Sequence, residues 1–231
     1  MKCVFSCLRE NPVGSRVIPF VAFVLLTFFQ GYVPEPGQYW IYLAKLLVGG
    51  WFLLLAGRAI PELRWNVSWE ALVIGFGVFV LWVGLDPLLQ QLGWANSYPK
   101  INLSGRPWNP PATFGHGTVA AWFFVGVRIL GSSILVPMLE EVFFRSFLYR
   151  YLERVDFLSV PLARFVMRPF LITSVVFGLE HREWLAGILA GFAYQFLVCR
   201  KGRIGDAVTA HAMTNFLLGL WVAGKGAWQF W

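Results

Sequence analysis

Two adjacent carboxylates interrupt a long apolar stretch of the sequence, where an ionisable side chain is costly unless it is paired or reaches water. They are Glu140 and Glu141, and Arg145 follows the second by four residues. Helical residues four apart share a face, so we expect Glu141 and Arg145 to form an ion pair, while Glu140 points about 100° away. This spacing leaves Glu140 available as a general base for hydrolysis.

Two histidines and an asparagine occur in other apolar stretches of the chain. His211 and Asn215 are also four residues apart, so they present an imidazole and a carboxamide to the same side of a helix. Both groups can donate hydrogen bonds, which is what a developing oxyanion requires. His181 follows Phe177 by the same interval, so the phenyl ring can pack beside the imidazole.

The depths of these groups in the membrane are compatible with one shared site. Counted from the nearest basic residue at the inner interface, at ~1.5 Å per helical residue, the heights are ~15 Å for Glu140, ~12 Å for His211 and ~20 Å for His181. Helix tilt and side-chain length can close these differences. The pattern therefore favours a joint hydrolytic site formed by Glu140, His181, His211 and Asn215.

Other polar groups near these residues have structural interpretations that do not involve catalysis. A lone intramembrane histidine or asparagine is more typical of an interhelical hydrogen bond than of catalysis, and only the coincidence of several favours a site. Asp206 lies close to Arg203 and the inner interface, so we interpret it as a helix N-terminal charge or an ion-pair partner. The spacing assigns no role to Glu180, Arg182 or Glu183.

The composition indicates that membrane helices must position these groups. Of 231 residues, 58% are hydrophobic and only 13% are charged, against about 25% charged in an ordinary soluble domain. The net charge of +7 comes from short basic clusters between apolar runs, which report membrane topology and argue against nucleic acid as a partner. No stretch could form a separate water-soluble core, so residues 1–231 are interpreted as one membrane-embedded domain.

Seven apolar stretches can be interpreted as membrane spans of an all-α, polytopic bundle. They are about Val17 to Val33, Tyr39 to Gly57, Trp69 to Leu89, Trp122 to Arg150, Phe165 to His181, Trp184 to Cys199 and Ile204 to Ala223. The fourth is too long for a simple crossing, and Gly131-Ser-Ser with Pro137 could kink it or divide it. We therefore expect seven to eight helices, with N-terminal helices and an external loop at about 17–117 and the catalytic helices at about 118–223.

Basic residues mark alternate connections as cytoplasmic, because cytoplasmic loops retain positive charge. The clusters are Lys2, Arg9 and Arg16 before the first span, Arg58 and Arg64 after the second, Arg150, Arg154, Arg164 and Arg168 after the fourth, and Arg200, Lys201 and Arg203 after the sixth. The opposite side carries Lys100, Arg106, Arg182 and Lys225. Seven spans thus place the N-terminus in the cytoplasm and the C-terminus outside.

Three further features concern processing and the connections. The first apolar run lacks a small-residue cleavage pattern, so a retained helix is favoured over a signal peptide. The longest connection, roughly Gln90 to Gly117, is interpreted as an external loop whose tryptophans anchor it at the interface, in preference to a substrate-binding loop. Cys3, Cys7 and Cys199 show no metal-ligand spacing and are expected to be free thiols.

The motifs together resemble the CAAX protease and bacteriocin-processing family, which includes the Ras-converting CAAX endopeptidase. The resemblance consists of Glu140-Glu141-x-x-x-Arg145, Phe177-x-x-x-His181 and His211-x-x-x-Asn215, in the family's order, and covers about the C-terminal half. Gly178-Leu-Glu-His and the closing Trp228-Gln-Phe-Trp are similar to a bacterial subgroup of CAAX prenyl protease-related proteins. That subgroup accompanies exosortase and PEP-CTERM systems.

The resemblance implies a CAAX-endopeptidase-like fold and a glutamate-dependent intramembrane endopeptidase without a metal or other cofactor. Glu140 and His181 would activate a water, His211 and Asn215 would stabilise the oxyanion, and Glu141 and Arg145 would support them. The absence of an HExxH spacing agrees with this. The implied setting is the bacterial inner membrane, with a membrane-associated protein or peptide as substrate and a functional link to an exosortase system. A prenylated substrate is not assumed.

Two alternatives compete with a glutamic peptidase. Glu140, His181 and His211 could instead be ligands of a catalytic zinc, since two histidines and a carboxylate suit that metal. The polar clusters could also merely join helices in a non-catalytic membrane scaffold or an immunity-type protein. A transporter is disfavoured because the sequence shows no repeated halves.

Overall fold

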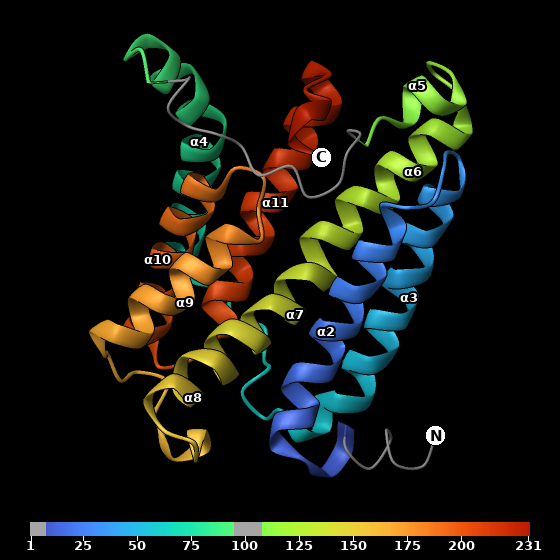
Figure 1. The fold of residues 1–231 in the computed structure, drawn as a ribbon. Helices are drawn as coiled ribbons and strands as arrows, with labels where there is room; N and C mark the ends of the chain where they lie inside the picture. The colour runs from blue at the N-terminus through green and yellow to red at the C-terminus, as the bar shows by residue number, and fades with distance from the viewer. Residues whose placement is uncertain (1–7, 95–107) are drawn as a thin grey trace.

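The computed structural model describes residues 8–94 and 108–231, and within these ranges its regular structure is helical (Figure 1). Cys3, Cys7, Lys100 and Arg106, for which the sequence suggested thiol or topological roles, lie outside the described residues. Cys199 is a free cysteine, as expected. The all-α prediction is confirmed for the part of the chain that the structure describes.

All seven apolar stretches are helical, with boundaries within several residues of those expected. The main elements are α2 (Pro12–Gln30), α3 (Gly37–Ala56), α4 (Trp69–Gln91), α5 (Pro110–Phe114), α6 (Val119–Leu130), α7 (Val136–Glu141), α8 (Tyr149–Glu153), α9 (Met167–Leu179), α10 (Trp184–Lys201) and α11 (Gly205–Lys225). Short 3-10 turns in the described part of the chain include η1 (Gly57–Ala59), η5 (Phe157–Ser159) and η6 (Trp228–Phe230). In Figure 1, α2 begins at the lower end of the bundle and α11 ends at the upper end.

The fourth stretch is one continuous helix of 35 residues, Val119–Glu153, and is not divided in two. Two π-helical segments, η3 (Gly131–Leu135) and η4 (Val142–Leu148), join α6, α7 and α8. Pro137 stands in the first turn of α7, directly after η3. A proline there has no N–H to donate, and the wider π-turn before it absorbs the missing bond without breaking the helix.

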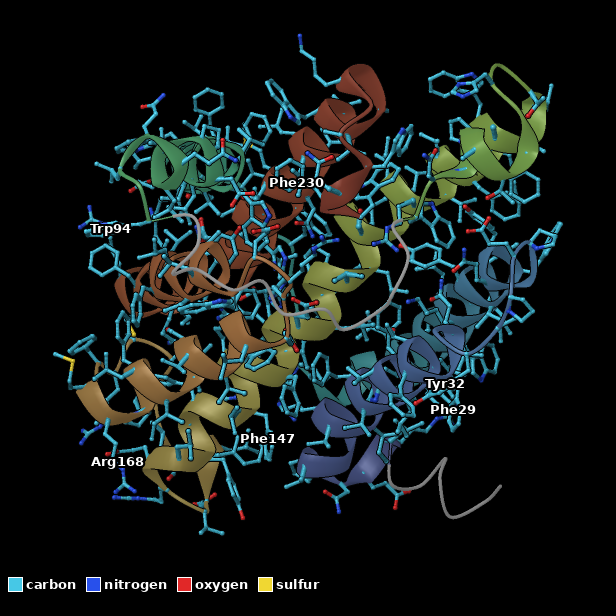
Figure 2. The ribbon with its side chains drawn as sticks, turned by 45° about the horizontal axis from the view of Figure 1, so that its top comes forward. Phe29, Tyr32, Trp94, Phe147, Arg168 and Phe230 are labelled. Carbon is cyan, nitrogen blue, oxygen red and sulfur yellow. The ribbon has the colours of Figure 1, made fainter. Side chains whose placement is uncertain are left out.

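Among the described residues, five helical segments are long and apolar enough to cross a membrane. They are Pro12–Gln30, Gly37–Ala59, Trp69–Gln91, Val119–Glu153 and Gly205–Lys225, while Met167–Leu179 is a shorter apolar helix. Large apolar side chains such as Phe28, Leu54 and Phe76 are more than half exposed on the outside of the bundle. Phe29 and Tyr32, labelled close together in Figure 2, are likewise more than half exposed. An apolar exterior of this kind fits lipid, and the chain is a multi-pass membrane protein.

The long α6–α8 helix runs diagonally through the middle of the molecule (Figure 1). Helices α2 and α3 pack together on one side of it, and α4 with α11 and α9 with α10 pack as pairs on the other. Small residues allow α9 and α10 to approach closely, because a Cβ added at Gly187 would lie 2.9 Å from the Gly178 Cα. Such contacts are typical of helix pairs in membranes.

A polar cluster ties the base of the bundle together; we call it the basal cluster and define it as Arg16, Glu62, Ser146 and Arg150. Glu62 lies in the connection between α3 and α4, and its Oε1 accepts from Arg16 Nη2 at 2.7 Å, Arg150 Nη2 at 2.8 Å and Ser146 Oγ at 2.5 Å. Burial alone would raise the pKa of Glu62, but the hydrogen bonds from Ser146 and Arg16 and the charge of Arg16 lower it below its ordinary value.

Candidate active site

Helix α7 ends with the two adjacent carboxylates, and only one of them is paired as the sequence predicted. Glu141 is fully buried, and its Oε2 lies 3.2 Å from Arg145 Nε. The Arg145 guanidinium also lies 4.3 Å from the centroid of the Phe177 ring and donates to the Gly191 carbonyl from Nη2 at 3.4 Å. The predicted Glu141–Arg145 pair is therefore present and is fixed by α9 and α10.

His211, in α11, stands between the two carboxylates. Its Nδ1 is 3.0 Å from Glu141 Oε1, and its Nε2 is 3.8 Å from Glu140 Oε2. The ring stacks on Tyr194, with centroids 5.0 Å apart and an interplanar angle of 20°. A carboxylate paired with arginine accepts hydrogen bonds, so Nδ1 carries the proton and a neutral ring offers an unprotonated Nε2 to Glu140. The Nε2 atom of His211 can therefore donate a hydrogen bond only after it has been protonated. The sequence predicted a donor at this position but did not reveal this condition.

His181 lies two residues beyond the end of α9, and a backbone carbonyl fixes its orientation. Its Nδ1 is 2.7 Å from the Phe177 carbonyl oxygen, which can only accept, so Nδ1 carries the proton and Nε2 is the free acceptor. The predicted packing of Phe177 beside this imidazole is present, with centroids 4.9 Å apart, and Trp82 of α4 contacts the ring at 5.4 Å.

Asn215 is oriented by the first π-helical segment. Its Nδ2 donates to the Ser132 carbonyl oxygen at 2.8 Å, and Ser132 lies within η3. A π-turn leaves main-chain carbonyls available to such partners. A carboxamide nitrogen has two hydrogens, so the second remains available for another acceptor.

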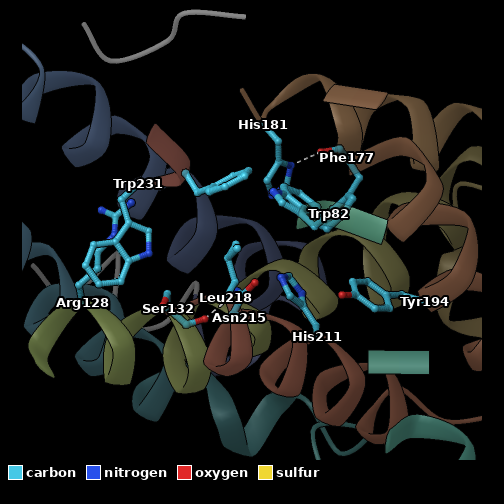
Figure 3. Close-up of a pocket in the computed structure, with 11 residues that line it drawn as sticks. Trp82, Arg128, Ser132, Phe177, His181, Tyr194, His211, Asn215, Leu218 and Trp231 are labelled. Carbon is cyan, nitrogen blue, oxygen red and sulfur yellow. Dashed lines mark hydrogen bonds between the residues drawn. The ribbon is translucent and has the colours of Figure 1, made fainter. Parts of the chain in front are cut away.

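A cavity of about 150 Å³ brings three of the four predicted residues together (Figure 3). His181, His211 and Asn215 line it, together with five aromatic side chains and with Arg128 and Ser132 of the long helix. Glu140 reaches the same place through its Oε2, beside His211, and its side chain is 12% exposed. The structure therefore assembles the four residues in one region.

Glu180 also lies close to these residues, although its position in the sequence gave no reason to expect it there. One possible ligand atom from each of Glu140, Glu180 and His181 lies within 4.8 Å of the others. Glu140 Oε2 and Glu180 Oε1 are buried without a hydrogen-bond partner. Two carboxylates and an imidazole can bind a divalent cation, and this set replaces His211 of the zinc alternative with Glu180.

The sequence did not identify every residue of the cavity. Arg128 could have been found in the sequence as a cation within an apolar run. Tyr194 and Trp82 could not, because aromatic residues are frequent throughout this chain. Asp206, in the first turn of α11, forms the ion pair that the sequence suggested. Its Oδ2 lies 2.5 Å from Arg203 Nε.

Comparison with known proteins identifies the segment that carries these residues. Residues 121–217 match the family described as "Type II CAAX prenyl endopeptidase Rce1-like". This segment runs from α6 to α11 and contains Glu140, His181, His211 and Asn215. The predicted resemblance to the CAAX protease and bacteriocin-processing family is confirmed over these residues.

A curated protein also resembles part of the chain. The "Putative membrane peptidase YdiL" of Bacillus subtilis (strain 168) is 35% identical over 95 residues, which are 39% of this chain and 35% of the relative. The chain thus spans about a third of the length of this relative. No solved structure matches the chain significantly.

Proposed function

We propose that this chain is an intramembrane endopeptidase of the CAAX type, which hydrolyses a peptide bond of a membrane-associated protein or peptide. The observation that carries the proposal is the placement of His211 Nε2 3.8 Å from the unpartnered Glu140 Oε2, at a cavity that His181 and Asn215 also line. The match of residues 121–217 to a family of endopeptidases supports it.

Glu140 and His181 are the proposed bases for the attacking water. Glu140 has a carboxylate oxygen without a hydrogen-bond partner, and His181 has a free Nε2 because its Nδ1–H is held by Phe177. One carboxylate oxygen of Glu140 and one ring nitrogen of His181 lie within 4.8 Å of each other, a separation that one water can bridge. Attack of its oxygen on the scissile carbonyl transfers a water proton to these acceptors.

Asn215 and His211 are the proposed oxyanion donors. Asn215 offers the amide hydrogen that Ser132 leaves unused, while His211 becomes a donor when a proton passes from Glu140 to its Nε2 across the 3.8 Å separation. The proton taken from water thereby creates the second donor when negative charge develops. Collapse of the tetrahedral intermediate returns that proton to the leaving amine, which leaves a carboxylic acid and an amine as products.

A cleavage assay with matched variants tests the proposal. The purified protein in nanodiscs should release fragments from a labelled pool of membrane peptides, and Glu140→Gln should abolish release. Glu153→Gln is the matched control, because Glu153 pairs with Arg164 outside the cavity. Equal cleavage by wild type and Glu140→Gln would overturn the proposal.

A metal-dependent hydrolase is the second candidate, and the proximity of Glu140, Glu180 and His181 favours it. Two such close carboxylates repel one another unless a proton or cation lies between them. Chelation followed by metal add-back, with metal content measured in wild type and Glu180→Gln, separates the two mechanisms. Activity that survives complete chelation rejects the metal mechanism.

The cellular setting is proposed from the charge pattern and the resemblance of the motifs. We place the protein in the bacterial inner membrane with α2 starting at the cytoplasmic face, and we link it functionally to an exosortase system. Reporter fusions after Ala59 and Lys225 test the orientation. Comparison of membrane and secreted peptides from wild-type and Glu140→Gln cells would identify the substrate, and a scaffold would leave the two peptide sets identical.

A further inference from the structure

The segment that follows α11 turns back to the cavity, and the proposed hydrolysis does not use it. We call residues Gly226–Trp231 the lid segment. Gly226 has a φ of 65°, in the left-handed region, which ends α11 and reverses the direction of the chain. Figure 1 shows this reversal at the upper end of α11. The short turn η6 then places Phe230 and Trp231 in the wall of the cavity.

The cavity has too little room for a peptide in its present shape. Its volume is about 150 Å³, whereas pockets that hold drug-sized molecules occupy roughly 300–1,000 Å³. A peptide bond that reaches His211 and Asn215 must bring its flanking residues with it. Part of the cavity wall therefore has to move before a peptide can be cleaved there.

The lid segment is the weakly attached part of this wall. The other residues that line the cavity belong to, or closely follow, the long helices α4, α6–α8, α9, α10 and α11. In the described ranges, one main-chain hydrogen bond joins the lid segment to an element other than α11, from the Trp108 N–H to the Trp231 carbonyl oxygen at 3.3 Å. Phe230 and Trp231 are both only partly buried. Segments with few buried contacts open at a low cost in free energy.

We propose that the lid segment turns about Gly226 to admit substrate, and that its two aromatic rings determine which molecules enter the cavity. Figure 3 shows Trp231 at one side of the cavity, with Asn215 between it and His211. In the closed position the rings occupy space beside Asn215, and in the open position they leave that space to the residues that flank the scissile bond. Lids of this kind exclude water and commit the substrate to reaction. The inference rests on the proposed function, because it assigns an entry step to the same cavity.

Two glycines near the end of α11 provide a matched pair for testing the hinge. A Cβ added at Gly224 would meet nothing within 4 Å, and one added at Gly226 would meet Trp228 Nε1 at 3.8 Å, which is an ordinary contact. Alanine therefore fits at both positions. Of the two, only Gly226 has a positive φ, which is unfavourable for alanine. Gly226→Ala should therefore favour the open lid, whereas Gly224→Ala should not.

Labelling of a cysteine inside the cavity tests the lid without requiring cleavage. Ser132→Cys is introduced into a chain whose native cysteines are replaced by serine; Ser132 lines the cavity, and its main-chain carbonyl still binds Asn215. The protein in nanodiscs is treated with methyl methanethiosulfonate or with a hexapeptide that carries the same reactive group. Mass spectrometry follows each rate. Ser159→Cys is the matched control, because Ser159 is exposed in η5 and does not line the cavity.

Each rate is divided by the rate of Ser159→Cys with the same reagent. On this scale the peptide should label Ser132→Cys on the order of 10- to 1000-fold more slowly than the small reagent does, because a minor open state typically holds about 0.1–10% of the population. Gly226→Ala should raise the relative rate of the peptide about 5- to 30-fold. Phe230→Ala should also raise it, because it removes part of the wall, and Gly224→Ala should leave it unchanged.

Three results would overturn the inference. Equal relative rates for the two reagents would show that the cavity is already open to peptides. A preference for the small reagent that neither Gly226→Ala nor Phe230→Ala changes would place the entrance elsewhere. An equal increase for Gly224→Ala and Gly226→Ala would indicate a general loosening of α11. Because labelling needs no turnover, failure of the proposed peptidase activity is detected separately, in the cleavage assay.

Discussion

Two groups of buried charges in this protein differ in how completely they are paired. In the basal cluster, Glu62 Oε1 accepts from two arginines and a serine. Around the cavity, Glu140 Oε2 and Glu180 Oε1 have no hydrogen-bond partner. A fully paired buried charge holds elements together, whereas an unpaired one costs free energy that folding does not recover. The comparison separates charges that stabilise the helices from charges that are available for chemistry.

The Glu141–Arg145 pair stands between these two groups, because it is buried like the basal cluster yet touches the cavity through His211. Its proposed task is to orient the imidazole and to fix its tautomer. Substitutions should therefore divide into those that lower stability and those that lower activity alone.

The largest effect is expected for Arg145→Gln. It leaves Glu141 charged and buried without its partner, which typically costs about 3–5 kcal/mol of unfolding free energy. Chemical unfolding in detergent measures this loss. Arg164→Gln, in an exposed pair, should cost less than about 1 kcal/mol. If the two variants unfold alike, pairing at Glu141 does not stabilise the bundle.

The second largest effect is expected for Asn215→Ala. It should lower kcat on the order of 10²- to 10³-fold, because it removes one oxyanion donor. The same change removes the hydrogen bond to the Ser132 carbonyl, so unfolding must be measured in parallel. Asn215→Asp keeps the shape of the side chain and is the matched variant. Full turnover by Asn215→Ala would show that this carboxamide only joins α11 to η3.

Glu62→Gln should reduce stability by about 1–3 kcal/mol at neutral pH and leave kcat nearly unchanged. The folded pKa of Glu62 lies below its ordinary value of 4.5, so its carboxylate stabilises the fold above that pH. As pH falls through the lower folded pKa, wild type loses this stabilisation, and the variant, which has no charge, does not. Thermal unfolding curves of the two proteins should therefore converge in acid, and a constant gap would contradict the assigned pairing.

The smallest change in stability is expected for Glu140→Gln, even though this variant should lose all peptidase activity. Glu140 Oε2 has no hydrogen-bond partner to lose, so the unfolding free energy should shift by less than about 0.5 kcal/mol or rise slightly. Differential scanning fluorimetry beside the cleavage assay checks both expectations. A large loss of stability would mean that Glu140 belongs with the paired charges.

The sequence predicted those features that depend on helical periodicity. Seven apolar stretches gave seven helices, and the four-residue interval of Glu141 and Arg145 gave their ion pair. Glu180 was not predicted, because it follows the last residue of α9, where the helical period no longer fixes direction. The tautomer of His211 also depends on a contact across 70 positions of the chain, which no local pattern reports.

The two π-helical segments have a consequence for how length changes would act on this protein. A π-turn holds one residue more than an α-turn, so deleting a single residue within Gly131–Leu135 could leave an unbroken helix. Because the π-turn accommodates the extra residue within one turn, the helix after the deletion would keep nearly its direction relative to Arg128. A deletion from the α-helical segment Val119–Leu130 would instead turn Glu140 by about 100° about the helix axis. The long helix can therefore lose a residue in its π-turns and still present Glu140 to the same side.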